Sequence, residues 1–164
     1  MAVAQASALQ EGLRTKMDEL AAGLKGISDA DASRAPAQGE WSVKELLSHL
    51  AGENDDFIVW SRLIVENDTP DLNVVPSQTH LSPARQSMPV GELLSKVRRQ
   101  YDEVGDFVAG LSEEQLNRKA HIALLKESPF GEYPTLAQWT QVIIDYHLAG
   151  HVASLPETRK QLGG

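Results

Sequence analysis

Cysteine is absent from this chain of 164 residues, which excludes disulfides, thiolate metal sites and a cysteine nucleophile. Long apolar runs are also missing, and none approaches the ~20 residues that a membrane-spanning helix needs. The first residues, MAVAQASALQEGLR, lack the basic and apolar regions of a signal peptide. We therefore expect a cytoplasmic protein that does not enter a membrane.

Basic residues are outnumbered, with 15 Lys and Arg against 23 Asp and Glu, a net charge of -8. The sequence pI is about 5.1. An excess of acidic residues repels nucleic acid, so we expect no nucleic-acid partner. The chain also lacks the glycine-rich motifs of common nucleotide sites and the G-x-S-x-G motif of serine hydrolases.

The residues that are present predict one helical domain spanning residues 1–164. Hydrophobic residues make up 41% and charged residues 23%, which is enough to form a real core. Apolar residues recur at spacings of three and four, as on one face of a helix. Four helices are predicted this way, over residues 4–25, 42–66, 89–108 and 134–161. Strand signals are weak, so we predict an all-α, antiparallel four-helix bundle with long crossover loops.

Two of these helices begin with a clear start signal. Ser42 and Glu45 have the spacing of a capping box, in which each side chain bonds the backbone of the other residue, and so do Thr135 and Gln138. Between the helices, the connections over 67–88 and 117–133 are unusually long. Unstructured connections of this length are expected to cross over the bundle or to cover a site.

Two histidines stand four residues apart in the last predicted helix. Residues with this spacing share a helix face, so His147 and His151 can direct both imidazoles at one metal ion. The apolar face of the same helix is centred on Ile143, with Tyr146 and Gly150 predicted close to it. The pattern H-x-x-x-H is common by chance and does not define a site alone.

The second predicted helix adds an imidazole and a carboxylate. His49 lies on the shoulder of its apolar stripe, and Glu53, one turn later, is predicted at the inward edge. An inward carboxylate is costly unless it is paired, protonated or bound to a cation. Three imidazoles with one open position are typical of a catalytic zinc site. The alternative is that the histidines are half-exposed and Glu53 pairs with a Lys or Arg. These residues alone favour neither interpretation.

Two stretches also resemble a known family. They are GEWSVKELLSHLAGEND and, about a hundred residues later, PTLAQWTQVIIDYHLAGHVASL, and they resemble the DinB/YfiT-like family of four-helix bundles. The resemblance implies that His49, His147 and His151 hold a divalent metal ion, with zinc or nickel favoured over iron. It further implies chemistry of the kind known in that family, which includes S-transferases and isomerases that use low-molecular-weight thiols.

The leading hypothesis is a metal-dependent enzyme acting on a small molecule. An open metal position would take water, a thiolate or a substrate oxygen, for hydrolase or thiol S-transferase chemistry. Glu53 is the predicted base, or the group that orients a ligand imidazole. The alternative is a non-enzymatic protein that binds or sequesters a small molecule in stress or resistance. His80 and His121, in the long connections, have no assigned role.

A second apolar strip in the last helix predicts self-association. Ile144, Leu148, Val152 and Leu155 lie on the flank opposite the predicted core face. A four-helix bundle would leave this strip in water, and burying such side chains is worth about 1.5–3 kcal/mol each. We therefore expect a homodimer with this helix in its interface.

Overall fold

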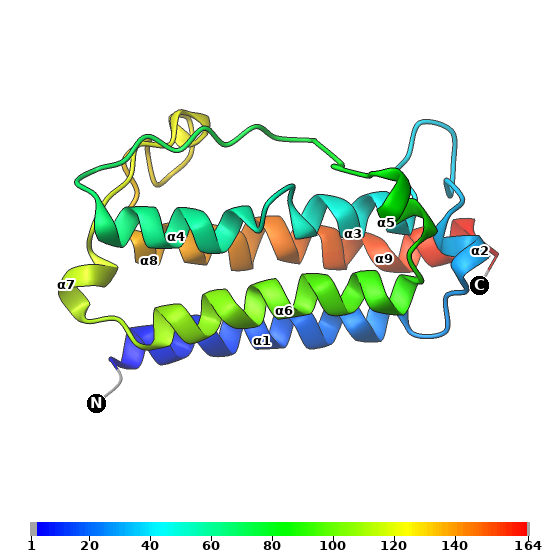
Figure 1. Ribbon diagram of the computed structural model, residues 1–164, viewed down its shortest axis with the longest axis horizontal. Helices are drawn as coiled ribbons and strands as arrows, with labels where there is room; N and C mark the ends of the chain where they lie inside the picture. The colour runs from blue at the N-terminus through cyan, green and yellow to red at the C-terminus, as the bar shows by residue number, and fades with distance from the viewer. Residues whose placement is uncertain (1–2, 164) are drawn as a thin grey trace.

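Helices make up nearly all the regular structure of residues 3–163, the part of the chain that this computed structural model describes (Figure 1). In chain order they are α1 (Ala4–Leu24), α2 (Asp29–Ala32), α3 (Val43–Ala51), α4 (Asp56–Glu66), α5 (Pro83–Ser87), α6 (Val90–Ala109), α7 (Glu113–Leu116), η1 (Ala123–Leu125), α8 (Leu136–Val142), η2 (Ile143–Leu148) and α9 (Ala149–Gln161). Within these residues, β structure is limited to two isolated bridges. The predicted all-α fold is confirmed.

Four rods form the bundle: α1, α3 with α4, α6, and α8 with η2 and α9 (Figure 1). Helix α1 packs on α6 and on the α8–η2–α9 rod, and α6 also packs on α3 and α4. The apolar stripe predicted for the first helix is buried at Leu9, Leu13, Met17, Leu20 and Leu24. None of the described helices is both long and apolar enough to cross a membrane.

The helix start signals predicted from the sequence are present in the structure. Both predicted capping boxes are present, at Ser42 with Glu45 and at Thr135 with Gln138. In each, the hydroxyl accepts a hydrogen bond from the N–H three residues on, and that residue's side chain accepts one from the first residue's N–H. These bonds satisfy N–H groups that the first helical turn leaves without partners.

The second predicted helix is not continuous, and this corrects the expectation for residues 42–66. Helix α3 ends at Ala51, and Gly52 follows with φ of 70°. That left-handed backbone is easy for glycine and is a common way to end a helix. Asp55 also has a positive φ, of 54°, and α4 begins one residue later. The turn breaks the helical register between His49 and the residues that follow.

The last rod is continuous, but its middle segment η2 is a π-helix. In an α-helix, residues four apart drift by about 40° per step, so a long stripe at that spacing winds away from its face. The wider π turn offsets part of this drift, and Trp139, Ile143, His147 and His151 all line one cavity. π segments occur frequently at functional sites.

The second apolar strip of this rod is buried within the single chain at three of its four residues, and the fourth, Val152, is partly buried against the core. Ile144, Leu148 and Leu155 are each less than 5% exposed. Two glycines of α1 allow the close packing: a Cβ at Gly12 would lie 3.0 Å from Ile144 Cδ1, and one at Gly23 would clash with Leu155 Cδ1. The expectation that a single chain leaves this strip exposed to water is therefore wrong. The homodimer prediction, which was based on that exposure, loses its support.

The long connection after α4 crosses over the bundle, as predicted. In Figure 1 it runs along the length of α4 and α3 to reach α5, so that α3–α4 and α6 run in the same direction. Backbone bonds tie its start to the other long connection, with Leu72 N donating to His121 O at 2.9 Å and His121 N donating to Pro70 O at 2.8 Å.

Truncating the buried strip should destabilise the chain itself. Leu148→Ala removes a side chain that is 1% exposed, so we expect the free energy of unfolding to fall by about 2–5 kcal/mol. The matched variant Leu63→Ala, at a 37% exposed position, should change it by less than about 0.5 kcal/mol. Urea unfolding at several protein concentrations measures both. A Leu148→Ala loss that grows with protein concentration would instead place Leu148 between two chains.

Candidate metal centre

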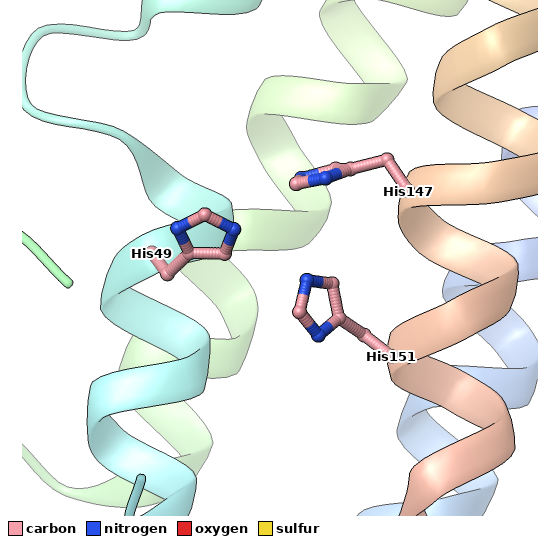
Figure 2. A group of neighbouring side chains, drawn as sticks. All are labelled: His49, His147 and His151. Carbon is pink, nitrogen blue, oxygen red and sulfur yellow. The ribbon is translucent and has the colours of Figure 1, made fainter. Parts of the chain in front are cut away.

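Three histidines converge from two rods of the bundle. His49 comes from the last turn of α3, His147 from η2 and His151 from α9, and their rings point toward one another (Figure 2). The ring centroids are 5.1 Å apart for His49 and His147, 5.2 Å for His49 and His151, and 5.1 Å for His147 and His151. One nitrogen of each ring lies within 4.8 Å of the other two. The structure thus brings together the three histidines singled out in the sequence.

One nitrogen in this cluster has no protein partner. His147 Nε2 is buried and makes no hydrogen bond. A buried polar atom without a partner is costly and calls for an explanation. Imidazole nitrogens are good ligands for zinc, nickel, copper and iron ions. A divalent cation among the three rings fits these donors and would give His147 Nε2 its missing partner.

The cluster also favours the protonation state that a metal requires. Burial, reinforced by the neighbouring imidazoles, lowers the pKa of His147 to about 3. Burial and the nearby His49 lower the pKa of His151 to about 4. Burial is likewise the main cause that lowers the pKa of His49. The imidazoles are therefore neutral at pH 7, with lone pairs available to a metal ion.

A backbone carbonyl of the crossover connection fixes the tautomer of His49. Its Nδ1 lies 2.6 Å from Gln78 O. Because a carbonyl oxygen only accepts, Nδ1 must carry the proton and donate it, which leaves the Nε2 lone pair free. Metal-ligating histidines commonly have such a partner on the other ring nitrogen. The crossover connection thus orients the ring of His49, which lies outside it.

Arg85 of α5 ties the same connection to the end of α3. Its guanidinium donates to Gly52 O at 2.7 Å, to Ser48 O at 3.2 Å and to Ser48 Oγ at 2.9 Å. It also donates to His80 O, at 3.3 Å. The last carbonyls of a helix have no partner within the helix, and a cation there is favoured by the helix dipole. Arg85 therefore holds the turn of α3 that presents His49. No local sequence pattern marks this contact across 37 residues.

An apolar cavity of about 310 Å³ opens beside the three rings. Aromatic rings continue outward from the histidines: Phe57 lies 5.5 Å from His147 and 5.2 Å from Trp60, between ring centroids. Both long connections contribute, as expected of connections that cover a site. The remaining walls include Trp41, Trp139, Val74, Val75, Leu124 and Leu125.

The predicted carboxylate is not in this cavity. Glu53 lies in the turn between α3 and α4 with an exposed side chain, so the expectation of an inward Glu53 is wrong. The positive φ of Gly52 ends the helix before Glu53 and removes it from the stripe. Asp56, in the first turn of α4, lines the cavity instead. Its Oδ2 accepts a hydrogen bond from Glu53 N at 3.2 Å. A helix break recognised at Gly52 would have pointed to Asp56.

The structure also locates the remaining residues that the sequence analysis named near the site. Tyr146 is 60% exposed rather than in the core, because the π turn rotates it outward, and Gly150 is exposed as well. His80 lines the cavity, although its ring is not part of the three-histidine cluster. His121 lies elsewhere, with Nδ1 2.8 Å from Asp71 Oδ1.

The fold and the site together define a four-helix bundle with a three-histidine cluster beside an apolar cavity. Comparison with known proteins gives the family. Residues 12–155 match the model of the DinB superfamily, and the chain belongs to that superfamily.

Two proteins from Bacillus subtilis are among those similar to this chain. The uncharacterized protein YuaE of strain 168 is 25% identical over 154 residues, which cover 85% of this chain and 90% of YuaE. The solved structure of YfiT, described as a probable metal-dependent hydrolase with an unusual four-helix bundle topology, superposes with a TM-score of 0.78. It covers 99% of this chain and 90% of YfiT at 16% identity, a likeness in fold.

Acid should destabilise the metal-free protein through these histidines. Their pKa values are lower in the folded than in the unfolded chain, so the unfolded chain binds more protons as the pH falls from about 6.5 towards 4. The free energy of unfolding should then fall by up to about 1.4 kcal/mol per pH unit for each such histidine. Urea unfolding of chelator-treated protein between pH 7 and pH 5 measures this slope.

A variant pair assigns the slope to the cluster. His147→Phe removes a titrating ring and should flatten the profile. His121→Gln should not, because hydrogen bonding to Asp71 raises the pKa of His121 and gives it the opposite sign. Equal slopes in the parent and in His147→Phe would show that His147 does not titrate as stated.

Proposed function

We propose that this chain is a divalent-metal-dependent enzyme, with hydrolysis as its leading reaction. The main observation in favour is that the buried His147 Nε2 has no hydrogen-bond partner, while the His147 ring lies beside two further imidazoles and an apolar cavity. Membership of the DinB superfamily and the description of YfiT as a probable metal-dependent hydrolase support the same assignment. His49, His147 and His151 would hold the ion, with zinc or nickel favoured.

A bound ion in this position would supply Lewis acidity and make a water or thiol acidic near neutral pH. The protein's own residues would exclude water and orient the metal-binding groups. The apolar walls exclude water from around the reacting molecule, which strengthens electrostatic interactions inside the cavity. Gln78 O holds His49 in one tautomer through Nδ1. These contributions orient the site before a substrate arrives.

Asp56 takes the role first given to Glu53. It is the only carboxylate among the described residues that line the cavity. Its Oδ2 accepts the Glu53 N–H, and an ionised carboxylate has further lone pairs that can accept a proton from a reacting group. A positioned general base contributes about 10²- to 10⁴-fold to a reaction rate.

Thiol S-transfer is the second candidate, since an open position beside three imidazoles accepts a thiolate as readily as water. The described residues that line the cavity include no Lys or Arg that could hold the carboxylates of a polar thiol, and this disfavours S-transfer. Binding without turnover, as in a sequestering protein, is the third candidate, and the apolar cavity fits it equally well. Turnover by the zinc-loaded protein separates the third from the first two.

Loss of any one histidine should abolish tight metal binding. We expect His49→Ala, His147→Ala and His151→Ala each to weaken zinc affinity by more than about 100-fold, because losing a ligand costs more than losing its outer partner. Calorimetric titration of tag-free protein measures the affinity. His121→Ala, a change outside the cavity, is the control and should bind like the parent. Three single variants that bind zinc as tightly as the parent would exclude this metal centre.

Asp56 and Glu53 provide a matched test of the base. With zinc-loaded protein and the neutral ester 4-nitrophenyl acetate, Asp56→Asn should lower kcat at least about tenfold while the zinc content stays unchanged. Glu53→Gln should retain the parent rate, since its side chain is exposed. A fully active Asp56→Asn would remove Asp56 from the reaction. A zinc-loaded parent without any turnover would favour binding alone.

A further inference from the structure

The cavity wall is unusual in its aromatic content. The chain has three tryptophans, and all of them, Trp41, Trp60 and Trp139, line this one cavity. Trp60 and Trp139 lie 6.0 Å apart between ring centroids, at an interplanar angle of 65°, and Phe57 contacts both. Aromatic pairs favour edge-to-face and offset arrangements, and a flat ring of a ligand can join such a cluster.

Charged side chains are nearly absent from the same wall. Among the described residues that line the cavity there is no Lys or Arg, and Asp56 is the only carboxylate. An organic anion entering this space would lose its hydration without gaining a cation partner from a side chain, and it would meet a carboxylate of its own sign. An uncharged molecule avoids both costs.

The rim of the cavity continues this apolar character. Val75 of the crossover connection and Leu124 of the other long connection both line the cavity. They are 49% and 50% exposed, among the most exposed large apolar side chains of the described chain. Exposed apolar groups at a cavity mouth are typical of ligand-binding grooves. A volume of about 310 Å³ lies at the small end of the roughly 300–1,000 Å³ found for ligand sites.

We infer that the cavity selects a small, uncharged aromatic molecule and rejects organic anions of the same size. The selection is made by the aromatic wall, the apolar rim and Asp56, together with the absence of Lys and Arg from the described residues that line the cavity. That this molecule is the substrate rests on the proposed function. Its binding does not, because the wall is complete without a metal ion.

The test compares two probes with the same ring system, 1-naphthol and 1-naphthalenesulfonate, on metal-free protein at pH 7. Quenching of tryptophan fluorescence reports occupancy directly, since every tryptophan lines the cavity, and calorimetry provides the affinity. We expect the neutral probe to bind at least tenfold more tightly. Equal or tighter binding of the sulfonate, or no binding of 1-naphthol, would overturn the inference.

A rim variant tests the cause of the selection. Val75→Arg places a cation where the described lining has none, and its exposed position should tolerate the change. We expect the preference for 1-naphthol to fall at least about fivefold through tighter sulfonate binding. Val59→Arg, at a 46% exposed position outside the cavity, is the matched control and should keep the parent preference. An unchanged preference in Val75→Arg would contradict the charge argument.

Zinc titration of the same protein separates the two proposals. Stoichiometric zinc without 1-naphthol binding would exclude the aromatic ligand and leave the metal centre intact. A protein that binds 1-naphthol but takes up no zinc in the titration would exclude the metal centre and leave the ligand class intact.

Discussion

Three neutral imidazoles are held side by side and partly buried, and the neighbouring elements are arranged to keep them there. Each ring loses part of its contact with water, and the buried His147 Nε2 gains no protein partner in return. Such a cluster persists only where the surrounding structure holds it. Two rods of the bundle must therefore be fixed against each other at this level. Arg85 fixes the end of α3, and Gly12 and Gly23 allow α1 to pack closely on the opposite rod.

The π segment allows the last rod to meet two packing requirements, one on each of two faces. One face must present Trp139 and His151, twelve residues apart, to the same cavity, and the other must bury Ile144 and Leu155 against α1. A regular α-helix would wind the first stripe through about 120° over that length. The wider turn of η2 reduces this winding and moves Tyr146 to the surface.

Much of this arrangement was predictable from local patterns, and the failures share a cause. The bundle, the capping boxes and the three histidines follow from short-range spacing, which helices preserve. Glu53 and Tyr146 were misplaced because each prediction assumed an unbroken α-helical register. Gly52 interrupts that register in one rod and η2 in the other. The hydrogen bonds of Gln78 O and Arg85 join distant segments, and no local pattern encodes them.

The crossover connection couples the two halves of the site. Through Gln78 O it orients His49, and through Val74 and Val75 it forms part of the cavity wall. One segment therefore sets both the tautomer of His49 and the shape of the cavity. A change that displaces this connection must alter the three-histidine cluster and the cavity wall together, whereas a change confined to Trp60 or Trp139 alters the wall alone. The bundle supplies the rigid frame, and the long connection links the cluster to the cavity.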